Sequence, residues 1–379
     1  MIDFHDILRI LVIKLRHIGD VLLTAPVFRA LRETFPGARI CALVHSGTQD
    51  VLEGNPDIDE VLVFDRGVKN LPFPRQVVRE GKFARGIRER GFDLAIDLTG
   101  GDRAAILSYL SGARYRIGWR DRKGFAGKRW MYTNLHSPDQ NCHMVAQNLS
   151  VVRSVGITTR NAAVTFPVSA KDRERAKEIL REYSGNGRIV HVHPTSRWMF
   201  KCWKDEYVAE VIRRLVDRGV TVLLTTSPAP REVERGGRIK VLLGDAPGVV
   251  DLRGRVTLRQ LGALSEISDL FLGVDSAPMH IAAAVGTPVV ALFGPSGVHN
   301  WGPWDNESAR EAGESLRMPY ARRRGNQVFG IHTAVQRDWD CVPCGESGCE
   351  STKWCRCLDD ILPEEIFPLV AGKLGLGEG

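Results

Sequence analysis

The segment Leu8-Arg-Ile-Leu-Val-Ile-Lys-Leu-Arg-His-Ile-Gly-Asp-Val21 contains a strand, a turn and the start of a helix, in that order. Leu8–Lys14 is a short apolar run rich in β-branched residues, which is typical of a strand buried in a parallel sheet. Apolar residues at helical spacing follow over Val21–Thr34, and Arg39–Val44 repeats the strand pattern. A strand, a helix and a strand in this order predict a parallel sheet with right-handed crossovers.

The same alternation continues along the chain and predicts an α/β protein. The further expected strands are Asp93–Leu98, Arg188–His193, Val220–Thr225, Leu270–Val274 and Val289–Phe293, and the further expected helices are Asp172–Glu182, Lys204–Arg218, Leu258–Glu266 and Pro278–Val285. Pro167–Lys171 is the expected linker. We therefore predict two Rossmann-like domains whose parallel sheets face each other across a cleft. Neither the dinucleotide-binding glycine motif nor the P-loop motif is present, which disfavours nicotinamide dehydrogenases and P-loop NTPases.

Length and composition favour a soluble globular protein of two domains. The chain has 379 residues, of which 43% are hydrophobic and 26% are charged. No run reaches the roughly 18 uncharged apolar residues that a membrane span needs. We also recognise no signal peptide, so we expect a cytoplasmic protein.

The positive charge is concentrated in the first part of the chain. Residues 1–165 contain 24 Lys and Arg against 17 Asp and Glu, whereas residues 166–379 contain 28 of each. The densest basic cluster consists of Arg114, Arg116, Arg120, Arg122, Lys123, Lys128 and Arg129, offset only by Asp121. This pattern suits a polyanionic partner such as a nucleic acid, an anionic lipid or a phosphorylated glycolipid, although a solvated basic loop is the alternative.

A turn, Arg16-His-Ile-Gly-Asp20, lies where the first expected strand ends. Open α/β sheets bind ligands at the carboxyl ends of their strands, so polar residues there are candidates for a site. Asp20 begins the following helix, where a carboxylate caps backbone N–H groups and gains about 0.3–1 kcal/mol from the helix dipole. The local pattern leaves two interpretations of Asp20 open: a helix cap, or a general base that faces the interdomain cleft.

A second loop, His193-Pro-Thr-Ser-Arg-Trp-Met-Phe-Lys-Cys-Trp203, follows a strand of the second half. Thr195 and Ser196 offer hydroxyls, and Lys201 offers a mobile positive charge, which together suit a phosphate group. We expect Trp203 to pack in the core rather than to stack on a ligand.

A third loop, Gly273-Val-Asp-Ser-Ala-Pro-Met-His280, ends one strand and begins a helix. Ser276 is placed to cap this helix, whose N-terminus offers an anion site. Asp275 is placed to hold a sugar hydroxyl. His280 lies one turn into the helix, where a structural hydrogen-bonding role is more common than an acid role.

Together the three loops resemble glycosyltransferase family 9, the ADP-heptose:lipopolysaccharide heptosyltransferases. The resemblance extends from about Leu8 to Trp304, and Ala277 replaces a glycine that is common in the family. An acidic ribose contact known in the family has no clear match near Ser227–Glu234. The matching stretches are Val12–Val21 with Thr24-Ala-Pro26, His193–Arg197 with Phe200–Trp203, and Gly273–Pro288 with Ala291–Pro295; the second pair is most similar to the heptosyltransferase III branch.

The resemblance implies a GT-B architecture and an inverting glycosyltransferase that needs no cofactor for catalysis. Residues 1–168 would form an acceptor-binding domain, residues 169–345 a nucleotide-sugar domain, and residues 346–379 a cysteine-containing tail with a helix that packs back toward the first domain. Asp20 would be the catalytic base that activates an acceptor hydroxyl of the lipopolysaccharide inner core. The implied donor-binding residues are Thr195, Ser196, Lys201, Asp275, Ser276, Ala277 and His280, and the implied acceptor-binding residues are Lys14, Arg16 and Arg120. The donor would be ADP-L-glycero-D-manno-heptose, and the enzyme would act on the cytoplasmic face of the inner membrane as a peripheral protein, in contact with anionic lipid.

Five cysteines form a separate cluster, Cys341-x2-Cys344-x4-Cys349-x5-Cys355-x-Cys357. Thiolates at such spacing can complete a tetrahedral zinc site, for which Cys341, Cys344, Cys349 and Cys357 are the candidate ligands. Disulfides and free thiols are the alternatives.

Two other functions remain open from the sequence. One is a family 9 transferase that uses another nucleotide sugar on a different cell-surface glycan. The other is a basic nucleic-acid-binding protein, which is disfavoured because no recognised helix-turn-helix or RNA-binding motif is present. We therefore expect no nucleic-acid partner.

Overall fold

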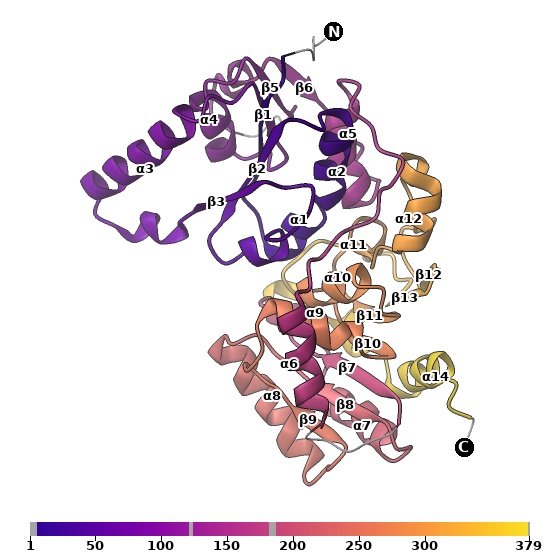
Figure 1. Cartoon of the computed structure of the whole chain (residues 1–379). Helices are drawn as coiled ribbons and strands as arrows, with labels where there is room; N and C mark the ends of the chain where they lie inside the picture. Colours follow the sequence, from indigo (N-terminus) through magenta and orange to yellow (C-terminus); the bar gives the residue numbers. More distant parts are fainter. Residues whose placement is uncertain (1–5, 121–123, 182–186, 378–379) are drawn as a thin grey trace. The chain divides into compact units, whose positions relative to one another are not determined.

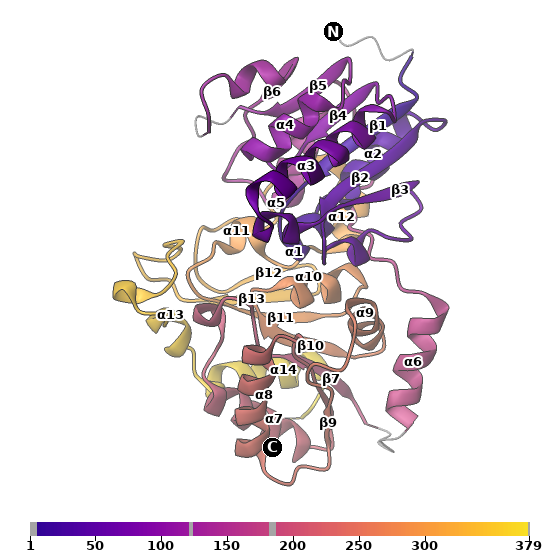
Figure 2. The same cartoon turned by 90° about the vertical axis from the view of Figure 1, so that its left-hand side faces the viewer.

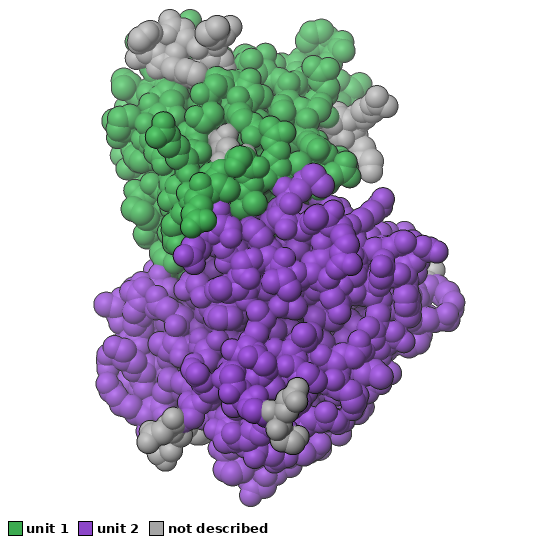
Figure 3. All heavy atoms as spheres, turned by 90° about the vertical axis from the view of Figure 1, so that its right-hand side faces the viewer, with its two compact units in different colours: residues 1–167, 309–317 green, residues 168–308, 318–379 purple. Residues whose placement is uncertain are grey.

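A computed structural model describes residues 6–120, 124–181 and 187–377. The chain divides into two compact units, coloured separately in Figure 3. Unit 1 spans Met1–Pro167 and Ala309–Arg317, and unit 2 spans Val168–Ser308 and Met318–Gly379. Arg122 and Lys123 of the basic cluster, and Glu182 at the end of an expected helix, lie outside the described residues.

Unit 1 is built on a parallel sheet of six strands in the order β3-β2-β1-β4-β5-β6 (Figure 2). α3 and α4 lie together on one face, and α2 and α5 contact each other on the opposite face (Figure 1). The strands are β1 (Arg9–Lys14), β2 (Arg39–His45), β3 (Glu60–Phe64), β4 (Leu94–Asp97), β5 (Tyr115–Trp119) and β6 (Asn134–His136). The helices are α1 (Ile18–Leu22), α2 (Ala25–Thr34), η1 (Gln49–Val51), η2 (Arg66–Asn70), α3 (Phe73–Arg88), α4 (Asp102–Leu110), η3 (Lys128–Met131) and α5 (Met144–Arg153).

Unit 2 contains a sheet of seven strands in the order β12-β13-β11-β10-β7-β8-β9, in which only β12 runs antiparallel to its neighbour. α7 contacts both α8 and α14, and α9 contacts both α6 and α10. The strands are β7 (Ile189–His193), β8 (Thr221–Leu224), β9 (Val249–Asp251), β10 (Leu270–Val274), β11 (Val289–Phe293), β12 (Gln327–Phe329) and β13 (His332–Gln336). The helices are α6 (Ala170–Arg181), η4 (Met199–Lys201), α7 (Asp205–Val216), α8 (Pro230–Leu243), α9 (Leu258–Glu266), α10 (Ala277–Ala284), α11 (Val298–Trp301), α12 (Asn306–Ala312, which crosses into unit 1), η5 (Gly313–Ser315), η6 (Cys349–Ser351), α13 (Arg356–Asp359) and α14 (Pro363–Leu374).

The predicted helix over Val21–Thr34 is wrong in one respect, because it is two helices. α1 ends at Leu22 and α2 begins at Ala25. Pro26 has no backbone N–H to donate to the carbonyl four residues earlier, so a continuous helix would leave that bond unmade. The hydroxyl of Thr24 instead donates to the carbonyl of Val21 at 2.6 Å and closes the break.

Buried apolar side chains fill the space between each sheet and its helices. In unit 2 the core includes Trp203, which is 1% exposed and donates its indole N–H to the carbonyl of Ile361 at 2.9 Å. Trp203 therefore packs as expected and connects the loop after β7 to the segment before α14. Gly273 in β10 allows a close approach, because a Cβ there would lie 2.9 Å from the carbonyl oxygen of His193 in β7.

Candidate functional site

The candidate residues lie at the point where each sheet reverses its strand order. In unit 1, β1 lies between β2 and β4, and in unit 2, β7 lies between β8 and β10. The carboxyl ends of strands at such a switch point form the usual ligand crevice of an open α/β sheet. Asp20 follows β1, Lys201 follows β7, and Asp275 follows β10. The candidate residues of each unit are thus positioned by the sheet itself.

The carboxylate of Asp20 does not cap a helix. α1 begins at Ile18 with His17 as its N-cap residue, so Asp20 lies within the first turn. Its side chain is half-buried, and within the described part of the chain it has neither a hydrogen bond nor an ion pair. The helix-cap interpretation is therefore wrong, and the structure leaves this carboxylate available to a ligand.

Lys14 supplies a buried positive charge close to Asp20. Its ammonium donates to the carbonyl of Leu98 at 2.8 Å and to Oδ1 of Asn148 at 3.1 Å. Burial lowers the pKa of Lys14 to about 8, against the opposing effect of the Asp20 charge. Lys14 is therefore mostly protonated at neutral pH, and its charge favours an anionic group beside it.

Arg16 and Arg120 are both exposed near the same edge of the sheet. Arg16 donates to the carbonyl of Thr99, which follows β4, at 3.0 Å, and Arg120 comes directly after β5. Their roles in acceptor binding, like that of Lys14, stay predictions.

Lys201 and Asp275 form a close ion pair across neighbouring strand ends. Nζ of Lys201 lies 2.6 Å from Oδ2 of Asp275, whose side chain is 7% exposed. Burial by itself would raise the pKa of Asp275, but the Lys201 charge and hydrogen bonds from Lys201 and Ser296 lower it overall. Asp275 is thus held as a carboxylate, and the Lys201 ammonium is fixed at the rim of the site.

The N-terminus of α10 adds an unused donor beside that pair. Ser276 is the N-cap residue of α10, and its buried hydroxyl has no hydrogen-bond partner among the described residues. Ala277 opens the helix, and a small side chain there leaves the backbone N–H groups accessible. A helix N-terminus attracts anions, so this end of the site suits a phosphate group. His280, one turn further on, is buried, and its charge when protonated would lower the pKa of Asp275.

Thr195 and Ser196 are buried and already take part in the local structure. Thr195 donates its hydroxyl to Oε2 of Glu232 in α8 at 2.7 Å. The hydroxyl of Ser196 accepts from the backbone N–H of Trp198 at 3.3 Å and shapes the turn that carries Lys201. Glu232 was missed from the sequence, because its pairing with Thr195 joins the loop after β7 to the first turn of α8, which is distant along the chain.

A chain of buried polar side chains leads from Thr195, whose Oγ1 lies 3.5 Å from Nε2 of His193, into the core. The Nδ1 atom of His193 lies 2.9 Å from Oγ1 of Thr225, which lies 2.8 Å from Nε2 of His191. The Nδ1 atom of His191 in turn lies 2.8 Å from Oγ of Ser265. Burial lowers the pKa values of both histidines to about 3, so both rings are neutral at pH 7.

Asp97 at the end of β4 was also missed from the sequence. It accepts hydrogen bonds from the Tyr132 hydroxyl at 2.6 Å and from the backbone N–H of Thr99 at 2.6 Å. The side chain is fully buried, and burial raises its pKa against the effect of these bonds. Asp97 therefore fixes the loop after β4, to which both Leu15 and Arg16 are hydrogen-bonded.

The predicted zinc site is not supported. All five cysteines of the cluster are free thiols, and among the residues that the structure describes no three His, Cys, Asp or Glu side chains are arranged to hold a metal ion. Burial, and then the nearby thiols of Cys355, Cys349, Cys344 and Cys341, raise the pKa of Cys357 to about 12. The five thiols thus gather in one region without the geometry of a coordination shell.

Two comparisons of the sequence with known proteins agree. The profile of glycosyltransferase family 9 (heptosyltransferase) matches residues 81–323. Lipopolysaccharide heptosyltransferase 3 of Escherichia coli is 33% identical over 328 residues, which are 83% of this chain and 92% of that protein.

Solved structures share the fold. The chain is similar to a family 9 glycosyltransferase from Veillonella parvula, with a TM-score of 0.77 and 23% identity over 97% of both chains. It is also similar to the ADP-heptose lipopolysaccharide heptosyltransferase II of E. coli, with a TM-score of 0.74 and 19% identity over 97% of this chain and 98% of that one. These likenesses, together with the two parallel-sheet units, confirm the predicted GT-B fold class.

Proposed function

Because this chain belongs to glycosyltransferase family 9 (heptosyltransferase) and is therefore a glycosyltransferase, we propose that it transfers a heptose to the inner core of lipopolysaccharide. The donor is ADP-L-glycero-D-manno-heptose, and the reaction inverts the anomeric carbon. A curated relative that is 33% identical carries the name lipopolysaccharide heptosyltransferase 3, and a structural neighbour is named for ADP-heptose. Both names support this choice of sugar and acceptor.

The Lys201–Asp275 pair carries the proposal for unit 2. In a glycosyl transfer from a nucleotide sugar, negative charge develops on the diphosphate as the bond to the sugar breaks. Lys201 and the N-terminus of α10 at Ser276 are fixed sources of positive potential, and preorganised charge of this kind lowers the barrier to departure of the leaving group. Asp275 orients Lys201 and offers an oxygen to donor hydroxyls.

Asp20 carries the proposal for unit 1. The carboxylate accepts the proton of the acceptor hydroxyl as the oxygen attacks the anomeric carbon from the side opposite the diphosphate. An ionised aspartate is a weak base, so correct positioning of both substrates must supply much of the acceleration, which can amount to about 7–11 kcal/mol. Unit 1, with Lys14, Arg16 and Arg120, binds the acceptor, and unit 2 binds the donor.

The enzyme works at the cytoplasmic face of the inner membrane as a peripheral protein. Among the described residues no helix is both long and apolar enough to cross a bilayer. The acceptor is a lipid-linked glycan, so the enzyme must meet it at a membrane surface.

Incubation of the full chain with a donor panel and defined truncated core acceptors tests the proposal. ADP-heptose, UDP-N-acetylglucosamine and GDP-mannose are offered in turn, and the products are analysed by mass. We expect a mass gain of one heptose with ADP-heptose alone. Turnover with only the other two donors would contradict the assignment of the sugar.

A further inference from the structure

The helix α3 exposes apolar side chains that the fold does not cover. Phe73, Val77 and Val78 are 77%, 52% and 59% exposed, although they lie in the first two turns of a regular helix. Only the face of α3 that carries Phe83 and Ile87 packs against the rest of unit 1. An exposed phenylalanine beside two exposed valines is unusual on a soluble surface and marks an interaction site.

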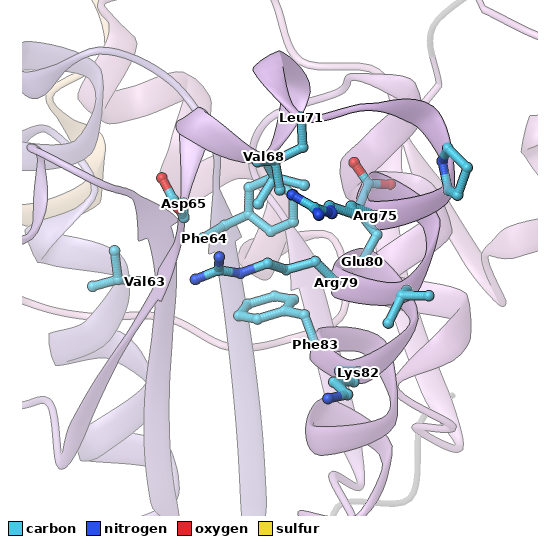
Figure 4. A pocket seen from close by; sticks show the side chains of 12 residues that line it. Val63, Phe64, Asp65, Val68, Leu71, Arg75, Arg79, Glu80, Lys82 and Phe83 are labelled. Atoms are coloured by element: carbon cyan, nitrogen blue, oxygen red, sulfur yellow. The ribbon is translucent and has the colours of Figure 1, made fainter.

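A hollow of about 910 Å³ lies between α3 and the segment of β3 and η2 (Figure 4). Its floor is apolar, with the rings of Phe64 and Phe83 in edge-to-face contact at 5.1 Å between centroids. Arg75 and Arg79 extend from α3 over this floor toward β3. The hollow therefore has an apolar floor, with positively charged side chains extending over it.

Three cations, Arg75, Arg79 and Lys82, line this hollow together with two carboxylates, Asp65 and Glu80. Arg75, Arg79 and Lys82 have no ion pair within the described ranges, whereas Glu80, the acidic residue of the helix beside them, is paired with Arg103 at 3.1 Å. Three unpaired cations beside exposed apolar groups suit a partner that is both anionic and apolar.

In the basic cluster that is densest in the sequence, Arg116 and Lys128 are already hydrogen-bonded within the fold and are therefore less available to a partner than the cations of α3. Arg116 donates to the carbonyls of Met131 and Ala113, and the buried ammonium of Lys128 donates to the carbonyl of Gly100. These charges hold the loops after α4 and β5 in place. The cations of α3 differ in that they line an apolar hollow, and the charge count of the sequence did not single them out. Within the basic cluster, Arg129 also places a cation beside an exposed apolar group, because it lies 4.4 Å from the centroid of the exposed Trp130 ring.

We propose that α3 and the hollow beneath it dock unit 1 onto an anionic phospholipid bilayer. Val78 and the apolar rim of the hollow at Leu71 and Pro74 enter the boundary between headgroups and acyl chains, while Arg75, Arg79 and Lys82 contact lipid phosphates. Amphipathic helices with this composition bind membranes through buried apolar area and attraction to anionic lipid. The inference deepens the proposed function and rests on it, because a transferase acting on a lipid-linked acceptor must reach the membrane surface.

Vesicle sedimentation with the full chain tests this inference. Vesicles of phosphatidylcholine alone are compared with vesicles of equal parts phosphatidylcholine and phosphatidylglycerol. We expect salt-sensitive binding to the anionic vesicles. Each cation near such a surface strengthens binding about fivefold, so Arg75→Gln/Arg79→Gln weakens it about 25-fold. Val78→Ser weakens it without changing the salt dependence.

Matched controls come from unit 2. Val241→Ser removes a valine of α8 that is 80% exposed, and Arg173→Gln/Arg175→Gln removes two exposed arginines of α6. Neither control is expected to change vesicle binding. Equal binding by the α3 variants and the wild type, or equal losses in the controls, would overturn the inference. A dimer that dissociates when Val78 is replaced would also overturn it, by assigning the surface to a second copy.

A second readout separates this inference from the proposed function. Heptose transfer to a soluble, deacylated core acceptor is expected to be unchanged in the α3 variants, while transfer to an acceptor embedded in anionic vesicles falls. A wild-type chain that binds anionic vesicles but transfers no heptose to the soluble acceptor would refute the proposed function and leave the vesicle result standing.

Discussion

Nζ of Lys201 lies 2.6 Å from Oδ2 of Asp275, and the two residues follow neighbouring parallel strands of unit 2, β7 and β10. The pair is largely withdrawn from water, with side-chain exposures of 21% and 7%. Removing one member of such a pair leaves an uncompensated charge in a low-dielectric site, which is more costly than losing a surface ion pair. We therefore expect the Lys201–Asp275 pair to contribute both to the stability of unit 2 and to ligand binding at the carboxyl ends of β7 and β10.

Replacement of Lys201 by methionine should therefore destabilise the protein by about 3 kcal/mol and weaken ADP binding. Arg173→Met is the control, because Arg173 pairs with Glu266 at 2.6 Å on the surface, where a loss of at most about 1 kcal/mol is expected. Denaturant unfolding gives the free energies, and titration calorimetry gives the ADP affinity. A Lys201→Met variant no less stable than the control would refute the coupling.

Asp20→Asn should lower heptose transfer by at least about 100-fold, the usual effect of losing a general base. Because the carboxylate has no hydrogen bond or ion pair with the described residues, and only its charge acts on the buried ammonium of Lys14, the free energy of unfolding should fall by no more than about 1 kcal/mol. Initial rates with ADP-heptose and urea unfolding are measured on the same preparation. Glu33→Gln, on the exposed face of α2, serves as a control that should retain full activity. Near-native turnover in Asp20→Asn would rule out the assigned role.

Thr195→Val should weaken ADP binding and reduce stability by about 1–3 kcal/mol. The substitution preserves shape but removes the hydroxyl that donates to Glu232 at 2.7 Å, so the buried carboxylate loses a donor. Thr195→Ser keeps the hydroxyl and should remain close to the wild type in both measurements. If the valine and serine variants behave alike, the hydrogen bond is not what positions Glu232.

The sequence pattern was sufficient to predict the strands and helices that surround both switch points. The expected bounds of β10, β11 and α9 agree with the structure to the residue, since long apolar runs and clear turn signals frame them. The edge strands β6, β9 and β12 are three residues each, and no periodicity can be recognised in so few positions. β3, β5 and β13 also went unpredicted.

The sequence predicted residues of the candidate site only where they lie on a loop that follows a predicted strand. Lys201 and Asp275 stand out because each follows a strand, whereas Glu232 lies inside α8 and looks like any charged helical residue. Its burial depends on the approach of the loop after β7, which only the folded chain brings about. The sequence also does not show which arginines form ion pairs or hydrogen bonds within the fold, so the unpaired cations of α3 could not be recognised from it.

Acidification should destabilise unit 2 through its two buried histidines. Unfolded histidine has a pKa near 6.5, whereas burial lowers the pKa values of His191 and His193 to about 3. Below pH 6.5 the unfolded state therefore binds more protons than the folded state, and the free energy of unfolding falls as the pH falls toward 3. Above pH 6.5 this contribution is complete and constant. Each histidine adds a slope of up to about 1.4 kcal/mol per pH unit.

Urea unfolding between pH 7.5 and 5 measures that slope, and His193→Asn isolates one histidine. Asparagine retains a polar atom that can reach Thr225, the partner of Nδ1 at 2.9 Å, but it does not titrate. The variant should be less stable than the wild type at pH 7.5, yet it should lose less stability on acidification, so that the two curves converge. His136→Asn is the control, because that ring is only partly buried and its pKa is lowered less. Parallel curves for His193→Asn and the wild type would mean that the buried histidine does not govern the acid sensitivity of unit 2.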